Sequence, residues 1–152
     1  ILEMFMRQLT MLHLFDQAME SILTTHCGIN PSIPFRGMGM RYLTNAFSLN
    51  MTPDTAILMK MPITQAEFCA VANDVSTINA IGHEDTANLI NTLCNVKLTV
   101  NRIAIKTGYG DEIYVIQLMT RLEEGKVLTL NELMEMLNKG LIKFYKVMVQ
   151  KP

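Results

Sequence analysis

Three groups of polar residues in this 152-residue sequence carry side chains that could perform chemistry. His83 lies at a predicted strand-to-helix corner, and histidine exchanges a proton near neutral pH, so it is suited to general acid–base catalysis. The stretch from Arg121 to Lys126 holds two cations and two carboxylates around a predicted turn at a strand end. Polar residues that follow the first predicted strand could hydrogen-bond a nucleotide or a phosphate; they are Asn45, Ser48 and Asn50.

Each of these groups also has a structural interpretation that involves no ligand. The histidine could cap the helix that follows it or hydrogen-bond a buried carbonyl, the charged stretch could form surface ion pairs, and the amide and hydroxyl groups could satisfy turns. The sequence contains no Walker loop, dinucleotide-binding glycine fingerprint, G-x-S-x-G elbow or H-x-x-x-H pair. General motifs alone therefore do not assign an activity.

The elements that would position these residues divide the chain into two parts. From Leu2 to Leu23, apolar residues recur at spacings of three, four and seven, which predicts an amphipathic helix. Glycines and prolines then crowd a connector that ends near Met40. We therefore predict an amino-terminal helix and connector over residues 1–39 and one folded domain over residues 40–152.

Short β-rich runs alternate with short helical patterns in the second part, which favours an α/β fold. The predicted fold is a mixed sheet of five to six strands flanked by three helices. Helices are predicted to begin at the capping positions Thr64 and Thr129 and near Glu84. The predicted strands are 41–47, 55–61, 76–80, 98–106, 113–119 and 142–149, with 98–106 and 113–119 forming a hairpin through a turn at 108–111.

Composition excludes several classes of protein. Hydrophobic residues make up 49% of the chain, charged residues 18%, and the formal charge is −1. These values disfavour disorder and long-range attraction to duplex DNA or an anionic membrane, and no apolar run approaches the roughly 18 residues of a membrane span. Three cysteines without C-x-x-C spacing, Cys27, Cys69 and Cys94, predict neither a disulfide framework nor a structural zinc site. We expect a reducing, cytoplasmic environment.

Four separated blocks of residues together resemble the viral anti-CRISPR ring nuclease family. They occur in the same order from about Met40 to the carboxyl terminus: Tyr42–Met51, Ile78–His83 with Thr86, Asn101–Arg102, and Arg121–Lys126. That family is a small dimeric α/β fold that destroys cyclic tetra-adenylate, the second messenger of type III CRISPR defence. The resemblance implies a homodimer, an enzyme, and a cytoplasmic location, that of the host cell if the protein is viral.

The resemblance also implies roles for individual residues. His83 matches the catalytic histidine that protonates the departing 5′ oxygen, and Glu124 matches the glutamate that assists the attacking ribose 2′-hydroxyl. Arg121 matches the arginine near the scissile phosphate, and Arg102 matches a second phosphate-binding arginine. Asn45, Ser48 and Asn50 correspond to ligand-binding positions. No metal or cofactor is expected, because an internal 2′-hydroxyl nucleophile makes a metal-bound water unnecessary.

Symmetry makes a dimer a suitable receptor for such a ligand. A ring of four identical nucleotides contains a two-fold axis, so a dimer could bind it on its own axis and present two equivalent sites to opposite phosphates. Two cuts would release linear di-adenylates. The alternatives are a non-catalytic module that sequesters a cyclic nucleotide, and a dimer that merely scaffolds a partner.

The first 39 residues depart from the small viral members of that family, which lack them. Residues Thr24–Gly28 resemble the histidine-glycine end of a HEPN ribonuclease motif, and cellular family members occur fused behind such enzymes. The arginine expected five residues before His26 is replaced by Ser21. We therefore expect a structural tail or the remnant of a fused domain, with a fused or associated HEPN ribonuclease as a candidate partner.

Overall fold

The computed structural model describes residues 39–152, which form one compact unit, Gly39–Pro152. This unit begins next to the boundary that the sequence predicts at Met40. The assignment of residues 1–39 as an appendage stays a prediction, because the helix predicted from Leu2 to Leu23 and the motif around His26 lie outside the described residues.

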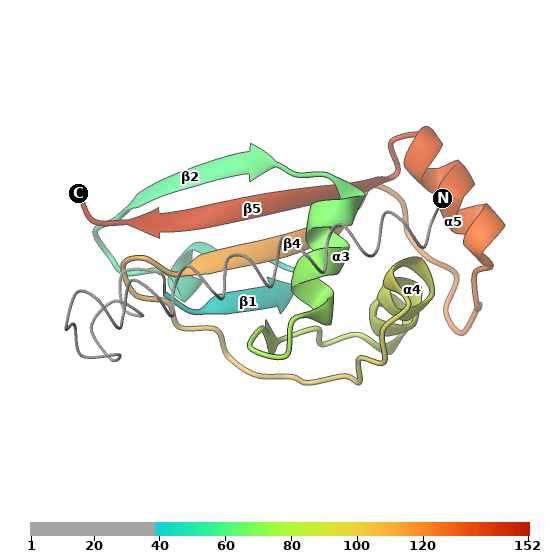
Figure 1. Cartoon of the computed structure of the whole chain (residues 1–152), viewed down its shortest axis with the longest axis horizontal. Coiled ribbons are helices and arrows are strands. Elements are labelled where there is room, and N and C mark those ends of the chain that lie inside the picture. Colours follow the sequence, from blue (N-terminus) through green and yellow to red (C-terminus); the bar gives the residue numbers. More distant parts are fainter. Residues whose placement is uncertain (1–38) are drawn as a thin grey trace, which may run out of the picture. The chain divides into compact units, whose positions relative to one another are not determined.

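The described residues contain a mixed five-stranded sheet with the order β2-β5-β4-β1-β3 (Figure 1). β1 runs parallel to both β3 and β4, whereas β5 runs antiparallel to β4 and β2. The strands are β1 (Arg41–Thr44), β2 (Ile57–Pro62), β3 (Ile78–Asn79), β4 (Glu112–Leu118) and β5 (Ile142–Gln150).

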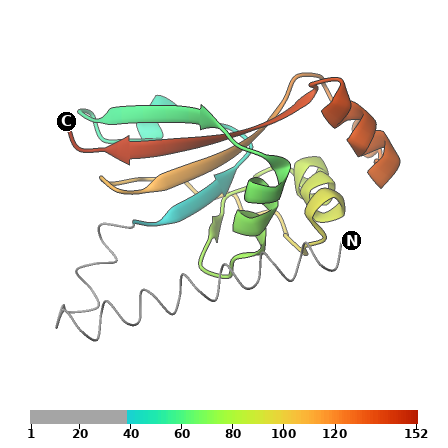
Figure 2. The ribbon, with the colours of Figure 1, turned by 45° about the horizontal axis from the view of Figure 1, so that its top comes forward.

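Three α-helices accompany the sheet in the described part of the chain: α3 (Gln65–Asn73), α4 (Glu84–Cys94) and α5 (Leu130–Asn138), with a short 3-10 helix η1 (Leu49–Met51) after β1. The Thr64 side chain accepts a hydrogen bond from the Glu67 amide, and Thr129 forms a reciprocal capping box with Glu132. Figure 2 shows α3 and α4 side by side against one face of the sheet. The predicted α/β class, with a mixed sheet and flanking helices, is confirmed.

Two apolar clusters cover opposite faces of the sheet. On the helical face, the rings of Phe68 and Phe144 pack with centroids 4.7 Å apart, beside the fully buried Leu43. On the other face, Ile113 and its neighbours pack against Phe47 and other partly buried side chains near η1. Burial of both faces holds the strand ends in place, because a shift of one residue in register would move buried side chains to the opposite face.

The predicted hairpin between 98–106 and 113–119 is wrong. Residues 98–106 form no strand, and β4 pairs with β1 and β5 instead. The segment is held by isolated hydrogen bonds: the Asn101 amide donates to the Ile81 carbonyl at 2.9 Å, and the Thr107 amide donates to the Met51 carbonyl at 2.8 Å. The alternating apolar and polar residues of this segment therefore belong to a long irregular connection and not to a hydrogen-bonded strand.

The first strand is shorter than predicted and ends at Thr44. The Thr44 hydroxyl accepts a hydrogen bond from the Ala46 amide at 3.2 Å and donates one to the Ala46 carbonyl at 3.1 Å. Such a local side-chain bond competes with the strand ladder and turns the chain. The turn brings Asn45 and η1 to the carboxyl end of β1.

A network of charged groups joins β1, β4 and β5 at the amino-terminal end of β1. The Glu112 carboxylate lies 3.7 Å from Arg41 and 3.5 Å from Lys146, and it accepts a hydrogen bond from the Tyr114 hydroxyl. Burial, followed by the hydrogen bond to Glu112, raises the pKa of Tyr114 well above its usual range. Tyr114 therefore stays protonated as a donor, and the network stabilises this register of the central strands.

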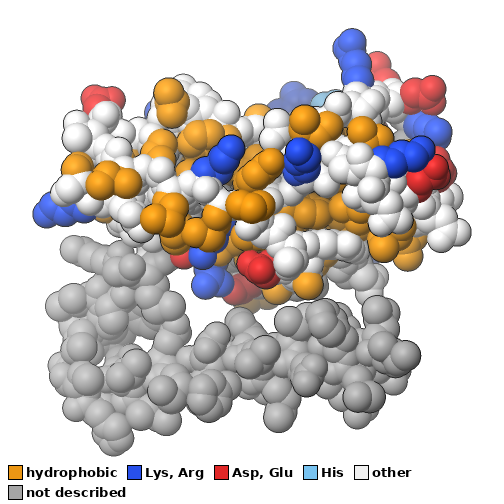
Figure 3. Space-filling model, turned by 90° about the horizontal axis from the view of Figure 1, so that it is seen from above, with side chains coloured by type: hydrophobic (Ala, Val, Ile, Leu, Met, Phe, Trp, Pro, Cys, Tyr) orange, Lys and Arg blue, Asp and Glu red, His pale blue; other side chains and the backbone are white. Residues whose placement is uncertain are grey.

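The described surface on the β2 side is rich in apolar side chains. Figure 3 shows hydrophobic side chains interspersed with basic side chains on this face, and Ile57 and Met59 of β2 are exposed. Lys60 and Pro62 on the same strand are features that limit uncontrolled pairing of a sheet edge. None of the described helices is long and apolar enough to cross a membrane.

The prediction that the cysteines form no disulfide framework is wrong for one pair. Cys69 of α3 and Cys94 at the end of α4 form a disulfide with a Cα–Cα distance of 5.0 Å. Spacing in the sequence did not reveal it, because the two helices come together only in the tertiary fold. The cysteines therefore no longer support the expectation of a reducing environment. The disulfide does not contradict that expectation either, because intracellular proteins of hyperthermophilic archaea contain disulfides.

Removing this disulfide tests its contribution to the fold. We expect Cys69→Ala to lower the free energy of unfolding by roughly 3 kcal/mol, because the bond closes a long loop in the unfolded chain. Urea unfolding of the wild type with and without a reductant, beside the variant, measures this effect. The reductant should weaken the wild type alone, and an unfolding midpoint of the wild type that ignores the reductant would contradict the expectation.

Candidate functional site

Three loops that carry predicted site residues leave the sheet at the same edge. Because β3, β1 and β4 are parallel neighbours, their carboxyl ends lie together. Asn45 follows β1, His83 lies shortly after β3, and the stretch from Arg121 to Lys126 follows β4. In open α/β sheets, ligands bind outside the carboxyl ends of parallel strands, so this edge is the candidate site.

Gly82 is the point at which two of the predicted ligand-binding residues meet. Its amide donates a hydrogen bond to the Asn45 side chain at 3.4 Å, and its carbonyl accepts one from Arg102 Nε at 2.9 Å. A Cβ atom at position 82 would lie 3.4 Å from the Arg102 side chain, which places that side chain directly against Gly82. The structure thus brings Asn45 and Arg102 together beside His83.

His83 is the N-cap residue of α4, but its imidazole does not act as the cap. The backbone carbonyl of His83 accepts a hydrogen bond from the Ala87 amide at 3.0 Å, whereas the side chain makes no capping hydrogen bond and is exposed. The imidazole is therefore accessible at the amino-terminal end of α4. The unpaired N–H groups of a helix amino terminus attract anions, so a phosphate beside His83 would meet a favourable field.

The loop from Arg121 to Lys126 reaches the same helix end. The Gly125 amide lies 3.4 Å from the Asp85 carboxylate, which belongs to the first turn of α4. Lys126 lies 3.5 Å from Glu132, so surface ion pairing accounts for that cation. Arg121 and Glu124 are exposed. The loop is thus placed next to α4, while these two side chains extend into solvent.

Ser48 and Asn50 are not bonded to this cluster in the described structure. The Ser48 hydroxyl donates to the Asn50 side chain, and the Asn50 carbonyl accepts a hydrogen bond from Lys106 at 3.1 Å. These bonds organise η1 and tie it to the segment before β4. Of the predicted ligand-binding residues, Asn45 and Arg102 are assembled around Gly82, whereas Ser48 and Asn50 serve a neighbouring turn.

Asn79 holds the site together and was given no role by the sequence. Its side-chain oxygen accepts a hydrogen bond from the Ile81 amide at 2.9 Å, and its amide group donates to the Thr99 carbonyl at 2.7 Å. The Asn79 backbone carbonyl accepts a further bond from the Asn101 side chain at 2.8 Å. Asn79 thereby fixes both the segment that leads to His83 and the segment that leads to Arg102. The signal for this role was the tendency of asparagine side chains to hydrogen-bond the backbone two residues further on, as Asn79 does with the Ile81 amide.

The described residues contain no group of three or more histidine, cysteine, aspartate or glutamate side chains that could hold a metal ion. What the edge does offer is a guanidinium, an exposed imidazole and a helix amino terminus close together. Arg102 uses Nε to bind Gly82, which leaves its two terminal nitrogens available to an anion. These groups are suited to bind a phosphodiester and to transfer a proton to it.

Fold and site together define a small α/β domain with a candidate anion-binding edge at the carboxyl ends of three parallel strands. Residues 41–145 match the model of the STIV B116-like family, and the chain belongs to that family. The predicted resemblance to a family of viral proteins is therefore confirmed at this level. The finer assignment to anti-CRISPR ring nucleases stays a proposal.

Relatives of the chain come from archaeal viruses. An uncharacterized protein of Acidianus filamentous virus 1, ORF116, is 38% identical over 105 residues, which cover 68% of this chain and 90% of that protein. Uncharacterized protein 26 of a Sulfolobus islandicus filamentous virus is 35% identical over 96 residues, which cover 62% of this chain and 81% of that protein.

A solved structure shares the fold. B116 of Sulfolobus turreted icosahedral virus superposes with a TM-score of 0.68 at 42% identity, covering 72% of this chain and 99% of that one. The α/β domain described above thus corresponds to the whole of that protein.

Substituting Asn79 tests whether it positions the two segments of the site. We expect Asn79→Ala to lower the free energy of unfolding by roughly 2 kcal/mol, because the Ile81 amide and the Thr99 carbonyl lose their partner. The exposed Arg121→Ala variant should change it by no more than about 0.5 kcal/mol. Urea unfolding of both variants decides the matter, and equal losses in the two would show that Asn79 has no special structural role.

Proposed function

We propose that this protein is a metal-independent ring nuclease that cleaves cyclic tetra-adenylate to linear di-adenylates and so switches off type III CRISPR signalling in the cytoplasm of the host cell. The observation that carries the proposal is the convergence of Asn45 and Arg102 on Gly82, next to the exposed His83 at the amino terminus of α4. Viral relatives are in keeping with a suppressor of host defence.

The proposed reaction needs only groups of this chain and of the ring. The 2′-hydroxyl of an adenosine attacks the adjacent phosphorus, so that the bond from the 2′ oxygen to phosphorus forms as the bond from phosphorus to the 5′ oxygen breaks. Glu124 takes the proton of the 2′-hydroxyl, and His83 gives a proton to the departing 5′ oxygen. A nucleophile held within the substrate needs no metal-bound water.

Negative charge that develops on the phosphate would be met by local donors. Arg102 is bonded to the carbonyl of Gly82, the residue just before the N-cap of α4, and Arg121 lies on the loop that contacts the first turn of α4. Fixed donors of this kind stabilise a transition-state charge more than a mobile solvent does. A net charge near zero is therefore compatible with a compact anionic ligand, although it gives no support for binding along duplex DNA.

A homodimer is part of the proposal, because the ring has a two-fold axis and this chain supplies one copy of each catalytic residue. A second copy would place an equivalent His83 at the opposite phosphate. A fused or associated HEPN ribonuclease remains a candidate partner, and the residues that suggest it lie outside the described part of the chain.

A second function, a module that sequesters the ring without cleaving it, is favoured by one observation. The binding half of the site, Asn45 and Arg102, is assembled by hydrogen bonds, whereas the Arg121 and Glu124 side chains are exposed on a loop. Sequestration needs the first pair only. Turnover additionally needs the loop to close over the phosphate.

Cleavage of the labelled ring tests the proposal. In the presence of a chelator, we expect the wild type to convert cyclic tetra-adenylate to linear di-adenylate, and His83→Ala to lower the single-turnover rate by about 100-fold or more, because a general acid typically contributes this much. Asn88→Ala, at an exposed position of the same helix, serves as the matched control and should retain the wild-type rate.

The alternatives predict different results in the same assay. Tight binding of the ring by the wild type with no product over many hours would favour sequestration. Neither binding nor cleavage would contradict both functions and favour a scaffold for a partner.

A further inference from the structure

A cavity of about 490 Å³ lies outside the candidate site. It is bordered by the segment from Asn73 to Thr77, which leads from α3 to β3, and by the segment from Asn95 to Leu98, which follows α4. These segments lie on the amino-terminal side of β3 and at the carboxyl ends of α3 and α4. His83, by contrast, follows the carboxyl end of β3 and begins α4. The cavity therefore lies at the other end of β3 from His83, although Asn79, which braces the candidate site, also lines it.

The walls of the cavity are braced by covalent and polar contacts. The disulfide between Cys69 and Cys94 ties α3 to α4, and the Asn73 side chain donates to the carbonyl oxygens of both cysteines, at 2.9 and 3.4 Å. Asp74 forms an ion pair with Arg41 at 3.6 Å. The cavity thus lies between two helix ends that are fixed to each other, so its shape is largely pre-formed.

Three polar side chains that line the cavity make no hydrogen bond or ion pair within the described structure. They are the Thr77 hydroxyl, which is shielded from solvent, the Asn95 amide and the Lys97 ammonium group. A buried polar atom without a partner is uncommon in native proteins. If a change of side-chain rotamer turned the Thr77 hydroxyl toward the cavity, a ligand there would supply the missing partner.

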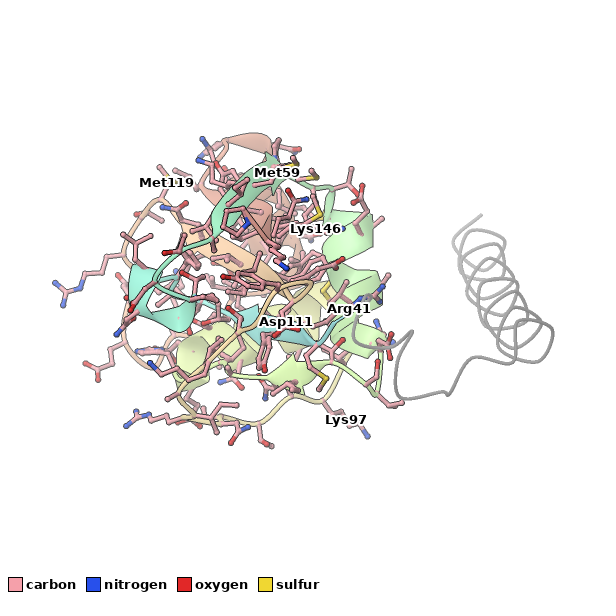
Figure 4. The ribbon with its side chains drawn as sticks, turned by 90° about the vertical axis from the view of Figure 1, so that its left-hand side faces the viewer. Arg41, Met59, Lys97, Asp111, Met119 and Lys146 are labelled. Atoms are coloured by element: carbon pink, nitrogen blue, oxygen red, sulfur yellow. A yellow bond between two sulfur atoms is a disulfide. The ribbon has the colours of Figure 1, made fainter. Side chains whose placement is uncertain are left out.

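These three groups differ in position and chemistry. The Asn95 amide offers a donor and an acceptor side by side, the arrangement that pairs with the edge of adenine. Lys97 is exposed, and Figure 4 shows its side chain pointing away from the domain, where it could reach a phosphate at the mouth of the cavity. The partly buried apolar side chains of Val96 and Leu98 form part of the lining and suit the faces of a planar base.

We propose that this cavity binds a purine nucleoside monophosphate, with the base between the ends of α3 and α4 and the phosphate on Lys97. The site has no free carboxylate among its described lining residues, since Asp74 is paired with Arg41, so it does not repel a phosphate from within. The proposal does not depend on ring cleavage, because Thr77, Asn95 and Lys97 make no contact with Gly82; Asn79, which also lines the cavity, is given no role in binding the nucleotide.

Titration of the full-length protein with adenosine monophosphate tests the proposal, with binding measured by calorimetry and located by shifts of backbone amide signals. We expect amide shifts at Thr77, Asn95 and Lys97. Lys97→Ala should weaken binding about 10-fold through loss of a charged hydrogen bond, and Asn95→Gly about 5-fold. Asn95 has a positive φ of 53°, which glycine adopts without strain, so this variant removes the amide alone.

Thr77→Val gives the sharpest prediction, because it replaces the unpaired hydroxyl with a methyl group of similar shape. We expect it to raise the melting temperature of the free protein while it weakens binding of adenosine monophosphate about 5-fold. A role in the fold alone would not move these two measurements in opposite directions.

Two variants serve as matched controls: Lys143→Ala, which changes an exposed lysine of β5, and Arg102→Ala, which changes the candidate site. Both should leave the affinity for adenosine monophosphate at this cavity unchanged. No binding at millimolar nucleotide would overturn the proposal. Unchanged affinity in Lys97→Ala, Asn95→Gly and Thr77→Val would also overturn it. The same holds if Arg102→Ala abolishes binding and the amide shifts of the wild type are confined to Gly82 and its neighbours.

Discussion

The parallel alignment of β1 with both β3 and β4 is the constraint on which the candidate site depends. It brings three carboxyl strand ends to one edge, and each is followed by a loop that carries a polar group. If any one of these pairs were antiparallel, one loop would leave the sheet at the opposite end. The buried clusters on both faces and the charged network around Glu112 stabilise this alignment.

Local interactions then shape the strand edge into the candidate site. Asn79 ties the segment after β3 to the long connection before β4, and this tie allows Arg102 to reach the Gly82 carbonyl. Asn45 holds the amide of the same glycine from the β1 side. The donors near His83 are thus the Arg102 guanidinium and the backbone N–H groups at the start of α4, while Asn45 and Asn79 hold the surrounding segments in place. Local donors of this kind explain how a chain of formal charge −1 could bind an anionic ligand.

The parts of the fold that depend on local signals were predictable from the sequence. The helices after Thr64 and Thr129 begin at the positions that their capping spacings indicate, and the acidic residues Glu84 and Asp85 mark the first turn of α4. The class of fold follows from the alternation of strands and helices. The position of His83 at a strand-to-helix corner was predicted for the same local reason.

What could not be predicted depends on contacts between segments far apart in the chain. Alternation over 98–106 looked like a strand, but the ladder position beside β4 is taken by β1 and β5. The pairing of Cys69 with Cys94 requires α3 and α4 to be packed together. The role of Asn79 likewise appears only when Thr99 and Asn101 lie next to it. In each case, tertiary packing decided between local alternatives.

The central claim is that the edge formed by the carboxyl ends of β1, β3 and β4 receives the phosphates of a cyclic oligoadenylate. The most direct measurement is a map of amide signal changes during titration with cyclic tetra-adenylate whose 2′-hydroxyls are methylated to prevent cleavage. We predict that the largest changes fall on Asn45, Gly82, Arg102 and Gly125. Changes confined to other parts of the domain, or no change at saturating ligand, would contradict the claim.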